Sequence, residues 1–172
     1  TNAKVDYRFR NGNKVQFEAY AIKVEELLRD VQEYLKSNPR TLDRQRVQIG
    51  NIGYRLVHEN EDEYIGERVE RWTRELEPRR GHLDKRITVE TPLDKPGAYL
   101  LTAQMEDGNT SRIIVWINDM VIVRKPLDDE YLYFVADAVT GKPVPRANIE
   151  FFGYRLDRRD RKLPLTRRYD VQ

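Results

Sequence analysis

Two histidines and two serines are the side chains of this sequence best suited to metal binding or nucleophilic catalysis: His58, His82, Ser37 and Ser111. A zinc site would need both histidines together with carboxylates from distant segments, because the chain has no cysteine to supply thiolate ligands. Neither serine lies in a Gly-x-Ser-x-Gly pattern or close to a plausible general base. We therefore interpret the histidines as ordinary surface residues. We assign no catalytic, cofactor-binding or metal-binding residue, and we predict that the chain is not an enzyme and needs no cofactor.

The other polar patterns have simple structural interpretations. The acidic clusters, Glu59 to Glu63 and Asp128 to Glu130, lack the regular alternation of a calcium-binding loop, so we interpret them as a solvated helix start and a turn. The segment Gly50-Asn51-Ile52-Gly53 lacks the Gly-Lys-Ser/Thr end of a phosphate-binding loop. Asn109-Thr110-Ser111 matches a glycosylation acceptor, but this pattern is common by chance. None of these segments is therefore assigned a ligand.

Composition excludes several further classes of protein. The 172 residues are 39% hydrophobic and 35% charged, with a net charge of +2, which indicates a globular, heavily solvated chain without a global electrostatic field. The absence of cysteine excludes disulfide bonds and thiol catalysis within this segment. No apolar run reaches the roughly 18 residues of a membrane-spanning helix. Residues Thr1 to Arg10 lack the apolar core of a signal peptide, and we expect the chain to be a segment of a longer protein.

The C-terminal tail, Arg155 to Gln172, supports a rival hypothesis of nucleic-acid binding, because phosphate contacts are made by arginine and lysine. Its basic residues are Arg155, Arg158, Arg159, Arg161, Lys162, Arg167 and Arg168. Three aspartates interrupt them, and aromatic residues are limited to Tyr154 and Tyr169. We favour a solvated tail connecting strands of a larger domain, and we predict no nucleic-acid partner.

The elements that would hold these residues begin with two strands. Lys4 to Phe9 and Val15 to Ala21 both alternate apolar and polar residues, with Asn11-Gly12-Asn13 between them, and we predict a β-hairpin. From Lys23 onward the apolar residues recur at helical spacing, and two glutamates occupy the first turn. This pattern predicts a helix near residues 23–36, which Ser37-Asn38-Pro39 ends.

The middle of the chain is less regular. Arg40 to Gln48 is polar and is predicted to be loop, and part of the stretch from Val47 to Val57 is predicted to be strand. A second helix is predicted for residues 63–76, because Ile65, Val69, Trp72 and Leu76 line one side and Pro78 follows. Trp72 and Trp116 both occupy apolar faces and are interpreted as core residues.

The second half of the chain consists of short apolar runs separated by turns. Predicted strands cover Ile87 to Glu90, Tyr99 to Met105, Arg112 to Ile117, Met120 to Val123, Tyr131 to Ala138 and Asn148 to Tyr154. Asp107-Gly108-Asn109 predicts a hairpin, and the segment from Thr140 to Pro145 predicts a reversal. The fold class that follows is mainly β: an antiparallel sandwich with two helical insertions, plus the start of a second sandwich.

Several motifs in this half occur in a characteristic order. They are Pro96-Gly97-Ala98-Tyr99-Leu100-Leu101, Ile114-Val115-Trp116-Ile117-Asn118-Asp119, Arg124-Lys125-Pro126-Leu127, Val135-Ala136-Asp137-Ala138, and Thr140-Gly141-Lys142-Pro143-Val144 with Ala147. Together they resemble the junction of two successive macroglobulin domains in bacterial α2-macroglobulin-like proteins. The strands Tyr7 to Asn11 and Val15 to Tyr20 resemble that family more loosely. The resemblance implies a macroglobulin-like sandwich over residues 1–118 and a truncated second one over 119–172.

The same resemblance implies a function for the parent protein. Members of that family are broad-spectrum protease traps, usually periplasmic or exported, in which cleavage of a bait region makes the molecule collapse round the protease. This chain contains no bait region that we identify and no cysteine for a Cys-x-Glu-Gln thioester. It would therefore be structural scaffold, with target proteases reached through the full-length parent and neighbouring macroglobulin domains as its contacts.

Two other hypotheses follow from the same residues. One is a different class of protein, a cell-surface sandwich module for adhesion or for binding carbohydrate or protein, which would share only the Thr-Gly-x-Pro-Val hairpin. The other concerns assembly: a second sandwich with too few strands leaves open strand edges, which are templates for pairing with another chain. We therefore expect the isolated segment to form a homodimer or to pack its second part onto its first.

Overall fold

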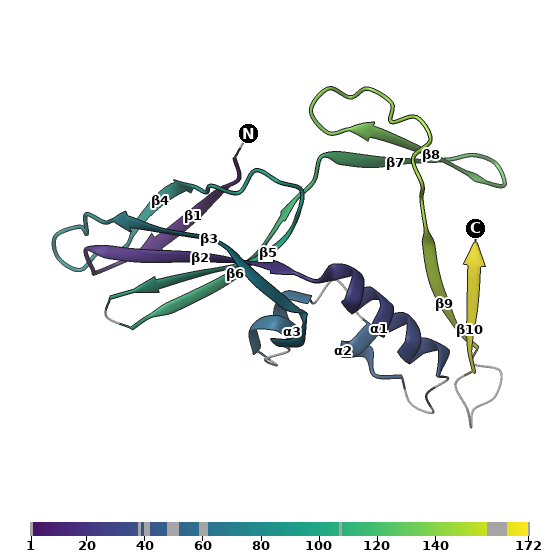
Figure 1. Cartoon of the computed structure of the whole chain (residues 1–172), viewed down its shortest axis with the longest axis horizontal. Helices are drawn as coiled ribbons and strands as arrows, with labels where there is room; N and C mark the ends of the chain where they lie inside the picture. The colour runs from purple at the N-terminus through teal and green to yellow at the C-terminus, as the bar shows by residue number, and fades with distance from the viewer. Residues whose placement is uncertain are drawn as a thin grey trace. The chain divides into compact units, whose positions relative to one another are not determined.

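The computed structural model describes residues 2–37, 39, 42–47, 52–58, 62–106, 108–157 and 165–171 (Figure 1). The protein is mainly β, with antiparallel sheets and few helices. It divides into two compact units: unit 1 consists of Thr1–Val24 and Gly50–Ile117, and unit 2 of Glu25–Ile49 and Asn118–Gln172. The predicted domain boundary at residues 118 and 119 remains a prediction.

Unit 1 contains most of the sheet structure. Its elements are β1 (Lys4–Phe9), β2 (Lys14–Ile22), α3 (Ile52–His58), a 3-10 turn (Asp62–Tyr64), β3 (Ile65–Glu75), β4 (Lys85–Glu90), β5 (Gly97–Met105) and β6 (Thr110–Ile117). The strands form a four-stranded sheet in the order β3-β2-β5-β6 and a two-stranded sheet, β1-β4, in which all pairs are antiparallel.

The predicted hairpin of β1 and β2 is wrong, because the two strands lie in different sheets. β1 pairs with β4, whereas β2 pairs with β3 and β5. Both strands carry an apolar face, and placing them in opposite sheets lets these faces bury each other. The rings of Tyr7 on β1 and Phe17 on β2 meet edge to face, with centroids 5.5 Å apart. The turn at Asn11-Gly12-Asn13 therefore connects two layers.

The core of unit 1 lies between these two sheets, in a sandwich-like arrangement. Its buried members are Tyr7, Phe9, Val15, Phe17, Ala19, Leu76, Val89, Leu93, Tyr99, Leu101 and Ala103. Alternate residues of β2 and β5 point into it, which is the period of two that the sequence shows. Burial of this set is the main stabilising contribution to the unit.

The predicted helix over residues 63–76 is also wrong, because this segment forms strand β3. Trp72 stacks on Phe17 of the neighbouring strand, with centroids 5.2 Å apart, and the next buried residue is Leu76. A register shift opposite Ala19 and Tyr20 inserts an extra residue into β3. That bulge gives the apolar residues a spacing that resembles a helical one. The many charged residues of β3 suit the edge of a sheet.

The first predicted helix is confirmed as α1 (Val24–Lys36), whose buried residues are Leu27, Val31 and Leu35. The predictions of loop and strand that follow it are wrong, because α2 (Arg44–Val47) and α3 are short helices. Asp43 caps α2, since its Oδ1 accepts a hydrogen bond from the backbone N–H of Arg46 at 3.3 Å. Gly50 and Asn51 lie outside the described residues.

Unit 2 contains α2 and nearly all of α1, and it also contains two hairpins. They are formed by β7 (Met120–Pro126) with β8 (Tyr131–Asp137), and by β9 (Phe151–Asp157) with β10 (Leu165–Val171). The predicted strands near Met120 and Tyr131 are confirmed, and β9 begins three residues after the predicted Asn148. The C-terminal tail, which was predicted to be a solvated connection between strands, is itself partly strand: its first residues continue β9 and residues 165–171 form β10. Residues 158–164 lie outside the described structure.

Two predicted turns are confirmed where the chain is described. Gly108, with a φ of +94°, lies in the β5–β6 hairpin, and Asp107 lies outside the described residues. After β8, Asp137 Oδ1 accepts a hydrogen bond from the N–H of Thr140 at 2.6 Å, and Gly141 has a φ of +68°. The strand predicted at Ile87 is confirmed as part of β4. No helix in the described ranges is long and apolar enough to span a membrane.

Candidate functional site

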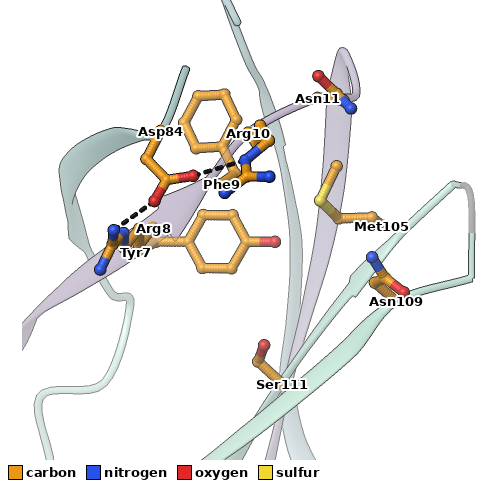
Figure 2. Close-up of a pocket in the computed structure, with 9 residues that line it drawn as sticks. All are labelled: Tyr7, Arg8, Phe9, Arg10, Asn11, Asp84, Met105, Asn109 and Ser111. Atoms are coloured by element: carbon orange, nitrogen blue, oxygen red, sulfur yellow. Dashed lines mark hydrogen bonds and ion pairs between the residues drawn. The ribbon is translucent and has the colours of Figure 1, made fainter. Parts of the chain in front are cut away.

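A cavity of about 560 Å³ opens in unit 1 between β1, the loop before β4 and the tip of the β5–β6 hairpin (Figure 2). Its lining residues are Tyr7, Arg8, Phe9, Arg10, Asn11, Asp84, Met105, Asn109 and Ser111. The rings and the thioether give it an apolar part, and the amides, the hydroxyl and the charged groups give it a polar rim. Its volume lies within the range of small-molecule binding sites.

The carboxylate that lines this cavity, Asp84, is held by two arginines that line it too. Asp84 forms ion pairs with Arg8 and with Arg10, whose Nε lies 2.9 Å from Asp84 Oδ1 (Figure 2). Hydrogen bonds from Arg10 and then Arg8 hold the pKa of the Asp84 carboxyl below its usual range. Asp84 therefore stays ionised at neutral pH, and its ion pairs make it a poor general base.

The remaining lining groups favour binding over catalysis. Burial raises the pKa of the Tyr7 hydroxyl, so this group stays protonated at neutral pH. Ser111 has no hydrogen-bonded base in the part of the chain that the structure describes. A serine nucleophile needs such a base, so the arrangement lacks the parts of a hydrolytic centre.

Two of the candidate residues from the sequence have ordinary hydrogen-bonding contacts. His82 Nδ1 lies 2.9 Å from Asn11 Oδ1, and the Ser37 hydroxyl donates to the Tyr34 carbonyl at 2.7 Å. The side chain of His58, and residues Glu59 and Glu61, lie outside what the structure describes. Among the described residues, no group of three or more histidine, aspartate or glutamate side chains is placed to hold a metal ion.

Two tryptophans were expected in the core, and only one lies there. Trp72 packs against the core, but Trp116 on edge strand β6 is 48% exposed, which corrects that prediction. Trp116 pairs with Ala98, whereas its neighbours Val115 and Ile117 are the residues of β6 that pack against the core.

The feature that the sequence predictions missed is an apolar surface on unit 2, which we call the β7–β8 surface. Every residue of β7 is exposed. The exposed large apolar residues of this surface are Met120, Val121, Ile122, Val123, Leu127, Tyr131, Leu132 and Phe134. Successive residues of a strand point to opposite faces, so the consecutive apolar run in β7 makes both faces of the hairpin apolar. The sequence signal was that continuous run, which is typical of a strand buried on two sides.

Comparison with known proteins gives no identification: no protein-family model, curated protein or solved structure matches this chain.

Proposed function

We propose that this chain is a structural scaffold segment of an α2-macroglobulin-like protease trap. The motifs between Pro96 and Ala147 support the proposal through their resemblance to the junction of two macroglobulin domains. In the proposal, unit 1 is a macroglobulin-like sandwich of the immunoglobulin-like class, and β7 to β10 belong to a second one. The parent protein would be periplasmic or exported.

The observation that carries the proposal is the β7–β8 surface. Ile122 is 58% exposed and Val123 is 53% exposed, although their side chains point to opposite faces of the hairpin. A contiguous apolar surface of this kind marks a site that another part of a protein covers. A two-stranded hairpin is at best marginally stable in water without such cover. A strand within a chain of stacked sandwich domains would have this cover on both faces.

The described side chains agree with a role that involves no chemistry in this segment. Asp84 is held by two arginines, and the hydroxyl of Ser111 has no base beside it in the described chain. In a protease trap, the cleavage site and the covalent link would be supplied elsewhere in the parent. The scaffold would transmit the collapse through its packed domains.

The experiment uses the natural full-length polypeptide that carries this chain. The protein is incubated with trypsin, and the cleavage pattern is followed together with trypsin activity on casein and on a small chromogenic peptide. One early cut, with trypsin retained, casein protected and the small peptide still hydrolysed, supports a trap. Scattered cleavage with no protection of casein contradicts it. Trypsin pretreated with an active-site inhibitor is the control, because it cannot make the triggering cut.

A further inference from the structure

The outward face of the four-stranded sheet in unit 1 carries polar side chains in rows that cross the strands. One row follows β3, β2, β5 and β6 and consists of Arg71, Glu18, Thr102 and Arg112. The next row on the same strands consists of Thr73, Gln16, Gln104 and Thr110. Solvated sheet faces are common, but here Gln16, Glu18 and Thr102 are only half-exposed. Part of these rows lines a depression of the surface.

This depression is a cavity of about 410 Å³ in which one side is apolar. Its lining residues are Glu18, Tyr20, Leu56, Asp62, Ile65, Leu100, Thr102, Gln104, Thr110 and Arg112. The apolar side consists of the half-exposed Tyr20 and Ile65, together with Leu56 of α3 and Leu100 of β5, which are almost fully buried. Figure 1 shows α3 beside the end of the sheet. The cavity thus has an apolar wall next to a floor of hydroxyl, amide and charged groups.

A second cavity of about 370 Å³ continues along the same face. It is lined by Lys14, Gln16, Thr73, Gln104, Met105 and Glu106 and shares Gln104 with the first. The two cavities adjoin at Gln104, and we call them together the sheet-face groove. From Leu100 to Glu106 a strand advances by about 20 Å, because each residue adds about 3.4 Å. The groove is therefore long enough for a chain of several rings.

One carboxylate of the groove is fixed by hydrogen bonds, and two neighbouring side chains are available for a ligand. The Tyr20 hydroxyl donates to Glu18 Oε2 at 2.6 Å, and Arg68 Nη1 donates to Glu18 Oε1 at 3.1 Å. Beside this fixed group, the side chains of Thr102 and Arg112 have no hydrogen-bonding or ion-pair partner among the residues that the structure describes. Two neighbouring strands thus present unused donors and acceptors next to a preorganised carboxylate.

We propose that the sheet-face groove binds an oligosaccharide. A sugar ring has an apolar face of C–H groups and an edge of hydroxyls, which matches the half-exposed Tyr20 and Ile65 and the polar floor at Thr102. Charged groups of both signs line the groove, including Asp62 and Arg112, so it favours a ligand without a strong net charge. This inference is independent of the protease-trap proposal.

The geometry disfavours the two other polymers that bind elongated grooves. An extended peptide is held through the unpaired backbone groups of an edge strand, whereas the floor of this groove consists of side chains on the face of the sheet, mostly from β2 and β5. A nucleic acid requires several unpaired basic residues for its phosphates. The groove instead carries two basic residues, Arg112 and Lys14, beside three acidic ones, Glu18, Asp62 and Glu106.

The test measures binding of three soluble hexasaccharides, cellohexaose, xylohexaose and chitohexaose, to residues 1–172 by isothermal titration calorimetry. The groove variants are Thr102→Val, which removes a hydroxyl at nearly constant volume, and Arg112→Met, which removes a charge from an exposed side chain. The matched controls are Thr88→Val and Arg86→Met, on the two-stranded sheet. Far-UV circular dichroism checks that each variant folds. If Thr102→Val fails to fold, Arg112→Met decides the test.

We expect at least one hexasaccharide to bind with a Kd below about 1 mM. Each groove variant should weaken this binding about tenfold, because the ligand's hydroxyl loses its partner, while the controls should leave it unchanged. Absence of binding by all three sugars overturns the proposal. Equal binding by the groove variants and the wild type also overturns it, because the sugar would then lie elsewhere.

Discussion

Replacing Phe17 with leucine tests whether the two sheets of unit 1 pack as described. Phe17 is 1% exposed and lies at the centre of the core. Its ring stacks on Trp72 at 5.2 Å, within 14° of parallel, and meets the edge of Tyr7 at 5.5 Å. Leucine keeps an apolar side chain at the site but removes both aromatic contacts.

The expected loss follows from these two contributions. An apolar exchange of this kind costs up to about 1.5 kcal/mol through imperfect packing. Each aromatic pair contributes about 0.5–1.5 kcal/mol beyond the area it buries. We expect the free energy of unfolding of unit 1 to fall by about 2 kcal/mol. For a domain of this size, that loss lowers the unfolding midpoint by about 10 °C.

The assay is urea unfolding followed by tryptophan fluorescence. A Trp116→Phe background leaves Trp72, the partner of Phe17, as the reporter, since the chain has two tryptophans. Phe134→Leu is the matched control, because Phe134 is 42% exposed on the β7–β8 surface and should change the stability of unit 1 by less than about 0.5 kcal/mol. A loss of less than about 0.5 kcal/mol for Phe17→Leu would refute the described packing.

Four further predictions concern two ionisable groups, a turn and the apolar surface. The hydrogen bond from Tyr20, together with Arg68 and Arg71, holds the pKa of Glu18 below its usual range. Tyr20→Phe should therefore raise the pKa of Glu18 toward the ordinary value in an NMR titration. An unchanged pKa would contradict the assignment. The pKa of Asp84 is lowered by Arg10 and Arg8, so its ion pairs stabilise the fold above the unfolded-state pKa, and this stabilisation is lost as the pH falls through the folded-state pKa. Arg10→Gln should therefore reduce the steepness of acid unfolding. An identical acid transition would count against this. Gly108 has a φ of +94° and open space around its Cβ position. Gly108→Ala should therefore lower the free energy of unfolding, measured with urea, by about 1 kcal/mol through backbone strain alone. An unchanged free energy of unfolding would mean that the turn is not left-handed. Ile122→Lys should lower the binding of the dye ANS, and also the self-association of residues 1–172 in analytical ultracentrifugation, without lowering the stability of unit 1. Unchanged dye binding would show that the β7–β8 surface is not the exposed apolar site.

Local sequence signals predicted the second half of the fold well. Gly108 marks a two-stranded hairpin whose strands carry continuous apolar residues, and the reversal after Asp137 depends on a local Asx turn. Helix α1 was predictable because Leu27, Val31 and Leu35 recur at helical spacing. In each case, neighbours in the sequence determine the structure.

The failures depend on distant partners. β1 and β2 have ideal hairpin patterns, but the fold pairs β1 with β4, about 80 residues away along the chain. The bulge in β3 produces a helix-like spacing that only pairing with β2 reveals. The cavity at Asp84 was not predictable either, because Arg8 and Arg10 reach that residue across a pairing between distant strands. The β7–β8 surface could have been inferred from the unbroken apolar run in β7.

The measurement that tests the central proposal most directly is small-angle X-ray scattering of the full-length parent before and after exposure to trypsin. If this chain is scaffold in a protease trap, cleavage should reduce the radius of gyration while trypsin co-elutes with the protein in size-exclusion chromatography. A radius that stays constant or increases, with trypsin eluting alone, would contradict the proposal.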